Sequence, residues 1–130
     1  MPSEEPTPKA ETTNKKRILI VEDERPLAHA LELKFQHEGY ETKTCTNGTE
    51  AMVEAKTGNY AIILLDLIMP EMDGFTFLSQ VDTKKIPIIV LTNLGQEEDR
   101  NKAKELGAKD YFVKSTTPIA QIVSIVKSLV

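Results

Sequence analysis

The sequence predicts an α/β fold: a doubly wound, five-stranded parallel sheet with helices on both faces. Strand-like and helix-like segments alternate five times from residue 17 onward, which is the pattern of repeated β-α units. The first, third and fourth strand-like runs are apolar throughout, as buried parallel strands are, whereas the second is polar and suits an edge. A strand order of 2-1-3-4-5 satisfies these observations.

The first half of the chain predicts two strands and two helices. Arg17–Val21 is a short aliphatic strand, and Pro26 suits the first turn of the helix that follows it. Apolar residues recur at helical spacing until Gly39 ends that helix, at Leu27, Leu31 and Phe35. Tyr40–Cys45 is polar and β-branched, which indicates an exposed edge strand. Residues 48–57 have a small apolar face typical of a helix.

The second half predicts three further strands, each followed by a helix. The strands are expected at Ala61–Leu65, Ile86–Leu91 and Tyr111–Val113. A loop rich in turn residues, from Met69 to Gly74, leads into the third helix. The fourth helix is the strongly charged segment Glu97–Leu106, and the last opens at Thr117-Pro118. Its apolar stripe comprises Ile119, Ile122, Val123, Val126 and Leu129.

Length and composition indicate one globular domain. A chain of 130 residues, 40% of them hydrophobic, has room for a single core. Residues 1–16 contain three prolines and no large aliphatic residue after the initiator, so they are predicted to form a mobile tail before a folded domain at 17–130. A docking motif in this tail is the alternative.

Charge and cysteine content narrow the partners and the compartment. The net charge of −4 favours neither nucleic acid nor an anionic membrane as a direct partner. No apolar run approaches the roughly 20 residues that span a bilayer, and residues 1–16 lack the apolar centre of a secretory signal. Cys45 is the single cysteine, which excludes an internal disulfide and suits a reducing compartment. We therefore expect a cytoplasmic protein.

Polar residues follow four of the predicted strands at the point where each strand ends. They are Glu22-Asp23, Asp66, Thr92 and Lys114. The carboxyl ends of parallel strands meet at one edge, and strands one and three flank the point where the winding reverses, which is where ligands bind. Three carboxylates that close together repel one another, and one ammonium group does not neutralise them. The arrangement predicts a divalent cation and an anionic substrate.

These residue types suit phosphoryl chemistry. Mg²⁺ prefers oxygen ligands and is commonly held by one or two carboxylates, and an aspartate such as Asp66 can form an aspartyl-phosphate. Lys114 would supply positive charge and Thr92 a hydroxyl donor for a phosphoryl oxygen. Each residue taken alone has an ordinary interpretation, as a loop cap, a turn former or a solvated surface lysine. Their joint placement favours function.

Four blocks, taken in order, resemble a known family. They are Ile18-Leu-Ile-Val-Glu22-Asp23-Glu24, Leu64-Leu-Asp66-Leu-Ile-Met69-Pro70-Glu-Met-Asp73-Gly74, Leu91-Thr92 and Tyr111-Phe-Val-Lys114. Together they resemble the response-regulator receiver domain of two-component signalling, of the chemotaxis-type stand-alone kind, from Arg17 to Val130. Members have the flavodoxin-like strand order predicted above.

The resemblance implies specific roles. Asp66 would accept a phosphoryl group from a sensor histidine kinase or a histidine phosphotransfer protein, so the domain is a signalling module and not an enzyme. The implied Mg²⁺ site comprises Glu22, Asp23, Asp66 and the backbone carbonyl of Ile68. The implied phosphoryl contacts are Thr92, Lys114 and the amides of Ile68 and Asn93. Movement of Thr92 toward the phosphate would let Tyr111 turn inward. This would change the face formed by the fourth helix, fifth strand and fifth helix, where a downstream protein target docks.

The chain departs from the family pattern at several positions beside the site. Ser115 follows Lys114 where the family usually has proline after a cis bond, and Asn93 replaces a small residue. Glu22 stands where aspartate is commoner, which lengthens that arm by one methylene. Two positions that influence phosphate hydrolysis in the family are apolar here, Ile68 and Leu94, and predict a long-lived phosphorylated state. Tyr111 has the alternative role of a half-covered edge-strand aromatic.

Three other functions compete with the stand-alone receiver. The chain could be the receiver part of a longer regulator, although no output domain follows the last predicted helix in this sequence. It could be a degenerate receiver that acts as a phosphorylation-independent scaffold. It could also be a small Mg²⁺-dependent phosphatase similar to the haloacid dehalogenase family, but those enzymes carry a second aspartate two residues after the nucleophile, where this chain has Ile68.

Overall fold

The computed structural model describes residues 15–130. The predicted tail lies outside the described residues except for Lys15 and Lys16, which are exposed. The strands are β1 (Arg17–Val21), β2 (Glu41–Cys45), β3 (Ile62–Leu65), β4 (Ile88–Thr92) and β5 (Asp110–Val113). The helices are α2 (Arg25–His37), α3 (Gly48–Thr57), α4 (Gly74–Gln80), α5 (Glu97–Glu105) and α6 (Ile119–Leu129), with a short 3₁₀ helix at Lys114–Thr116.

The five strands form one parallel sheet in the order β2-β1-β3-β4-β5, which confirms the predicted fold class. The register aligns the strand ends: Val21 of β1 pairs with Cys45 of β2 and with Leu65 of β3. At the other side of the sheet, Thr92 of β4 pairs with Val113 of β5. The residues that follow these strands are therefore delivered to one edge of the sheet.

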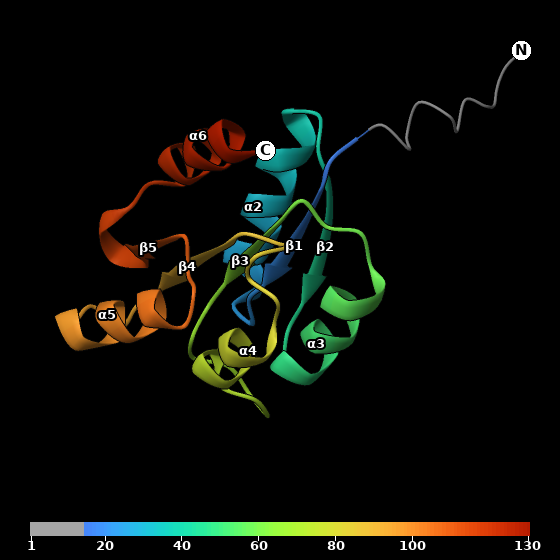
Figure 1. The fold of residues 1–130 in the computed structure, drawn as a ribbon. Coiled ribbons are helices and arrows are strands. Elements are labelled where there is room, and N and C mark those ends of the chain that lie inside the picture. The colour runs from blue at the N-terminus through green and yellow to red at the C-terminus, as the bar shows by residue number, and fades with distance from the viewer. Residues whose placement is uncertain (1–14) are drawn as a thin grey trace, which may run out of the picture.

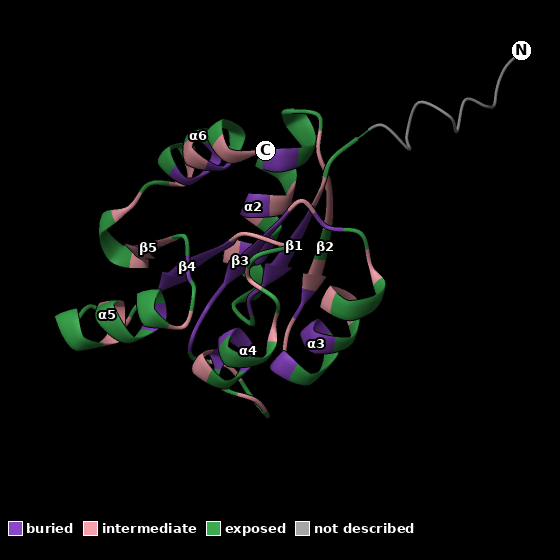
Figure 2. Cartoon of the chain, in the orientation of Figure 1, coloured by how far each residue is buried: buried purple, intermediate pink, exposed green. Residues whose placement is uncertain are grey.

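Helices cover both faces of the sheet (Figure 1). Successive strand residues point to opposite faces, so Ile18 and Ile20 of β1 pack against α2 and α6, whereas Leu19 and Val21 pack against the helices of the other face. Those helices are α3, α4 and α5, and they contribute Ala51, Phe77 and Ala103 among others. Figure 2 shows the buried residues gathered in the strands and on the inner sides of the helices.

Predicted and observed boundaries differ by one or two residues at several elements, and two element starts have a clear local cause. β4 begins at Ile88 and not at Ile86, because Pro87 has no N–H for the sheet ladder; its carbonyl still accepts a hydrogen bond from Ile63 at 3.0 Å. The third helix, α4, begins directly after Asp73, whose side chain accepts the Thr76 N–H at 3.0 Å and caps it.

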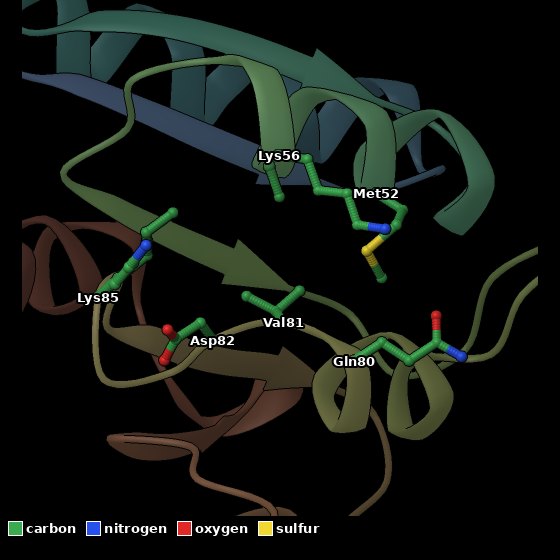
Figure 3. A pocket seen from close by; sticks show the side chains of 8 residues that line it. Met52, Lys56, Gln80, Val81, Asp82 and Lys85 are labelled. Carbon is green, nitrogen blue, oxygen red and sulfur yellow. The ribbon is translucent and has the colours of Figure 1, made fainter.

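A groove of about 300 Å³ opens between α3 and the segment that joins α4 to β4. Figure 3 shows Met52 and Lys56 reaching over it from α3, with Gln80 and Val81 at the end of α4. Because α4 ends at Gln80, the wall of the groove that faces α3 is an irregular segment and not a helix. The groove lies near the amino end of β4, at the edge of the sheet opposite the polar strand ends.

Among residues 15–130, no helix is both long and apolar enough to cross a bilayer.

Candidate functional site

The polar residues predicted at the strand ends do gather at the carboxyl edge of the sheet. Glu22, Asp66 and Thr92 are almost fully buried, with exposed fractions of 2%, 4% and 0%. Lys114 reaches them from the end of β5, and its side chain is 9% exposed. Asp23 stands beside them in contact with solvent. The site is therefore open on one side and enclosed by the sheet on the other.

The ammonium group of Lys114 binds three carboxylates. Its Nζ atom lies 2.9 Å from Glu22 Oε1, 2.9 Å from Asp66 Oδ2 and 2.8 Å from Glu24 Oε2. The contact with Asp66 joins β5 to β3 across β4, since the strand order places β4 between them. Lys114 therefore holds the two buried carboxylates together.

Glu24 is the site residue that sequence reasoning did not assign. It is the third acidic residue after β1, and its backbone N–H donates to Glu22 Oε2 at 3.0 Å. The sequence feature that could have identified Glu24 is the run of three acidic residues at the end of β1. This run does not by itself assign Glu24 to the site, because an acidic residue at this position also suits the start of a helix.

Three carboxylates fit a small divalent cation. Glu22, Asp23 and Asp66 each offer an oxygen, and these oxygens all lie within 4.8 Å of one another. Carboxylates this close repel one another, and hard oxygen ligands are the donor set that Mg²⁺ takes. The donor chemistry of these residues therefore fits the predicted Mg²⁺ site, which the Ile68 carbonyl was predicted to complete.

Burial changes the proton affinities of the site. It raises the pKa of Glu22 to about 7, although hydrogen bonds from Lys114 and from the Glu24 amide oppose the rise. For Lys114 the balance is reversed: burial lowers its pKa, but the hydrogen bonds to Asp66, Glu24 and Glu22 outweigh burial, and the pKa lies above its ordinary value. Lys114 is therefore charged at neutral pH, while Glu22 is poised to ionise when a cation binds.

The loop after β3 fixes the orientation of Asp66. The Asp66 Oδ1 atom accepts the backbone N–H of Ile68 at 3.1 Å, and Oδ2 faces Lys114. The loop closes where the Gly74 N–H donates to the Leu67 carbonyl at 2.8 Å. A Cβ atom at Gly74 would lie 2.8 Å from the Asp66 carbonyl oxygen and closer still to Leu67 Cα. This close approach explains glycine at position 74.

The remaining predicted residues lie at the rim or behind it. The side chain of Ile68 is 53% exposed, and Asn93 is exposed directly after β4. Thr92 is buried, and its Oγ1 atom accepts the Leu94 N–H at 3.4 Å. The peptide bonds of the described chain, Lys114–Ser115 among them, are all trans, and Lys114 begins the 3₁₀ helix.

Tyr111 is fully buried and not half covered, with an exposed fraction of 1%. Its hydroxyl donates to the Leu94 carbonyl at 2.6 Å. Arg100 of α5 lies over the ring at 5.0 Å from its centroid and donates to the Tyr111 carbonyl at 3.2 Å. The inward position of this side chain is therefore fixed by contacts to two neighbouring segments.

Comparison with known proteins identifies the family. Residues 18–127 match the model of the response regulator receiver domain, so the chain belongs to that family and is a receiver domain of two-component signalling. The transcriptional regulatory protein SrrA of Staphylococcus aureus is 42% identical over 113 residues, which cover 86% of this chain. The chain spans about half the length, 46%, of that curated relative.

Solved structures show the same fold. The receiver domain of the Francisella response regulator 1452 has a TM-score of 0.81 at 28% identity, and the match covers 88% of this chain and 96% of that one. The chemotaxis protein CheY4 of Vibrio cholerae also has a TM-score of 0.81, at 27% identity, with coverage of 89% and 99%. The resemblance noted from the sequence is therefore confirmed at the level of family and fold.

Proposed function

We propose that this domain accepts a phosphoryl group on Asp66 in a Mg²⁺-dependent reaction and thereby switches a protein-binding face. The observation that carries the proposal is the contact between Lys114 and Asp66, 2.9 Å apart in an almost fully buried site. A carboxylate held beside an ammonium group has a positive charge in place for an incoming phosphoryl oxygen. Such a site needs positioning and charge neutralisation more than covalent help.

The reaction transfers phosphorus from nitrogen to oxygen. An Asp66 carboxylate oxygen attacks the phosphorus of a phosphohistidine on a sensor histidine kinase or a histidine phosphotransfer protein, and the P–N bond breaks as the P–O bond forms. The histidine leaves with the bonding electron pair and takes up a proton. Lys114 then contacts a phosphoryl oxygen. The Thr92 hydroxyl and the amides of Ile68 and Asn93 donate to the others.

Glu22, Asp23 and Asp66 would hold the Mg²⁺ ion together with the Ile68 carbonyl. When bound, this ion supplies positive charge to the carboxylate and phosphoryl oxygens. The half-exposed Ile68 and the exposed Asn93 form the rim through which the donor histidine enters. Asn93 stands where such receivers usually carry a small residue, so its side chain would narrow access to the phosphoryl site.

The proposed output is the face of α5, β5 and α6, the fourth helix, fifth strand and fifth helix of the chain. Thr92 and Tyr111 link the site to this face, since Tyr111 lies on β5 and contacts Arg100 of α5. A new charge at Asp66 that draws Thr92 inward would shift the equilibrium between two arrangements of the face. A downstream protein target would read the change, and the cytoplasm would be the compartment.

Two forms of the whole protein remain candidates. A stand-alone receiver would signal by docking or phosphotransfer, without direct contact to nucleic acid. The receiver part of a longer regulator is favoured by the match to SrrA, which is about twice as long as the aligned region and is described as a transcriptional regulatory protein. In that form a further domain would carry the output.

The decisive experiment is phosphorylation by a small acyl phosphate with Mg²⁺, followed by intact mass. We expect one phosphate adduct in the wild type, none in Asp66→Ala and none with EDTA. Asp73→Ala is the matched control, since Asp73 lies in the same loop but caps α4; it should keep the adduct. An adduct that persists in Asp66→Ala would refute the site assignment. If the folded wild type accepts no phosphate, the result would favour a phosphorylation-independent scaffold. Sustained hydrolysis of phosphate esters would favour a small Mg²⁺-dependent phosphatase.

A further inference from the structure

Glu24 is an acidic residue of the site that the proposed reaction does not use. Its Oε2 atom lies 2.8 Å from Lys114 Nζ, and its side chain is 53% exposed. It differs from the other two carboxylates on Lys114, Glu22 and Asp66, because both of those belong to the cluster that could hold a metal ion. Glu24 is therefore the partner of Lys114 that a bound cation leaves available.

The position of Glu24 before α2 supports a role toward Lys114. Glu24 occupies the N-cap position of α2, and Pro26 in the first helical turn has no N–H to offer its side chain. The side chain makes no capping hydrogen bond and contacts Lys114. Its own N–H donates to Glu22, which ties the backbone of Glu24 to the buried carboxylate.

A cation at the carboxylate cluster changes the surroundings of Lys114. It would draw on the carboxylates of Glu22 and Asp66 that now accept from the ammonium group, and its two positive charges would repel that group. Lys114 would then lose two of its three partners while its side chain stays in an almost buried position. Contact with Glu24 is the arrangement among these residues that keeps the ammonium paired.

We propose that Glu24 is a positioning residue that holds the Lys114 ammonium when Mg²⁺ binds, and so keeps Lys114 next to the phosphoryl site. The inference rests on the function proposed above. It implies that Lys114 without Glu24 stays on Glu22 and Asp66 and competes with the cation for their oxygens. Removing Glu24 should therefore weaken Mg²⁺ binding, and should do so only where Lys114 is present.

A double-mutant cycle on Mg²⁺ affinity tests this dependence. Calorimetric titration with MgCl₂ would compare the wild type, Glu24→Gln, Lys114→Met and the double variant. We expect Glu24→Gln to weaken binding about three- to tenfold with Lys114 present, which lies within the coupling found between residues in direct contact. We expect no further weakening in the Lys114→Met background. Glu97→Gln, which removes an exposed acid in α5, should leave the affinity unchanged.

Two outcomes would overturn the proposal. Equal weakening with and without Lys114 would show that Glu24 acts only as a nearby negative charge, and no weakening with Lys114 present would show that it does not act at all. If the wild type binds no Mg²⁺, the proposed function fails as well, so the two failures are distinguishable. A crystal structure of the Mg²⁺ complex is the second measurement: the Lys114–Glu24 contact should persist while the Lys114–Asp66 contact is lost, and the reverse would contradict the proposal.

Discussion

The Tyr111 hydroxyl donates to the carbonyl of Leu94 at 2.6 Å, and the N–H of the same Leu94 donates to Thr92 at 3.4 Å. One peptide segment thus joins the hydroxyl at the end of β4 to the aromatic ring in β5. Movement of the Thr92 side chain toward a phosphoryl group would lengthen this contact with Leu94. The contact that fixes Tyr111 would then be disturbed as well, which gives the proposed switch a definite route of two hydrogen bonds.

Removing the Tyr111 hydroxyl should loosen this connection. Tyr111→Phe keeps the buried ring but leaves the Leu94 carbonyl without its donor, so we expect the free energy of unfolding to fall by about 1 kcal/mol. Burial raises the pKa of Tyr111, which keeps the hydroxyl protonated as a donor at neutral pH. Urea unfolding of the unphosphorylated protein measures the loss.

Tyr40→Phe is the matched control for that measurement. Tyr40 is half-buried against Phe35, at 6.1 Å between ring centroids, and its hydroxyl makes no hydrogen bond within residues 15–130. Its removal should change stability little. An equal loss in both variants would mean that the Leu94 contact contributes nothing of its own.

The sheet could be predicted because its signals are local. Aliphatic runs of four or five residues bounded by turn residues identify buried strands, and a single polar run, Glu41–Cys45, marks the edge. The ends of elements were harder to place. Pro87 lies next to an apolar residue at Ile86, and only the hydrogen-bond requirement of the sheet excludes both from β4.

The site was predictable in composition but not in its contacts. Parallel strands deliver their ends to one edge, so strand order predicts that Asp66 and Lys114 lie on the same edge of the sheet. Strand order does not predict the direction in which a long side chain extends. The contact of Glu24 with Lys114 and the hydrogen bond of the buried Tyr111 hydroxyl to the Leu94 carbonyl both depend on loop conformations that strand and helix patterns do not specify.

The pKa of Glu22 predicts how stability depends on pH without metal. The pKa is raised from 4.5 to about 7 in the folded protein, so the folded state binds the proton more tightly than the unfolded chain does. This contribution is fully present below pH 4.5 and is lost as pH rises through 7. It amounts to at most about 3 kcal/mol. Lys114 stays protonated throughout this range because its own pKa is raised.

Urea unfolding in EDTA at pH 5 and pH 8 compares the wild type with Glu22→Gln. The wild type should lose more stability between the two values than the variant, which has no proton to release at this position. Glu97→Gln controls for removal of an exposed acid and should follow the wild type. Parallel pH profiles for the wild type and Glu22→Gln would contradict the assignment of the transition to Glu22.

Gly74 should be intolerant of a side chain. A Cβ atom there would approach the Asp66 carbonyl at 2.8 Å and press on Leu67, so Gly74→Ala must displace the loop that orients Asp66. We expect a loss of about 1–3 kcal/mol and slower phosphorylation by a small acyl phosphate. Gly95→Ala is the comparison, since its nearest neighbour would be Val113 at 3.9 Å. Equal behaviour of the two variants would exclude loop displacement as the cause.

The phosphorylated state should be long-lived because the rim is apolar. Ile68 is 53% exposed beside Asp66 and Leu94 is partly buried beside Thr92, and neither side chain can orient a water molecule by hydrogen bonding. Ile68→Asn introduces an amide that can, so phosphate release followed by intact mass should be faster in this variant. Val53→Asn also replaces an exposed β-branched apolar residue by asparagine, on α3 away from the site, and should leave the rate unchanged. Slower release from Ile68→Asn than from the wild type would mean that the isoleucine does not protect the phosphate.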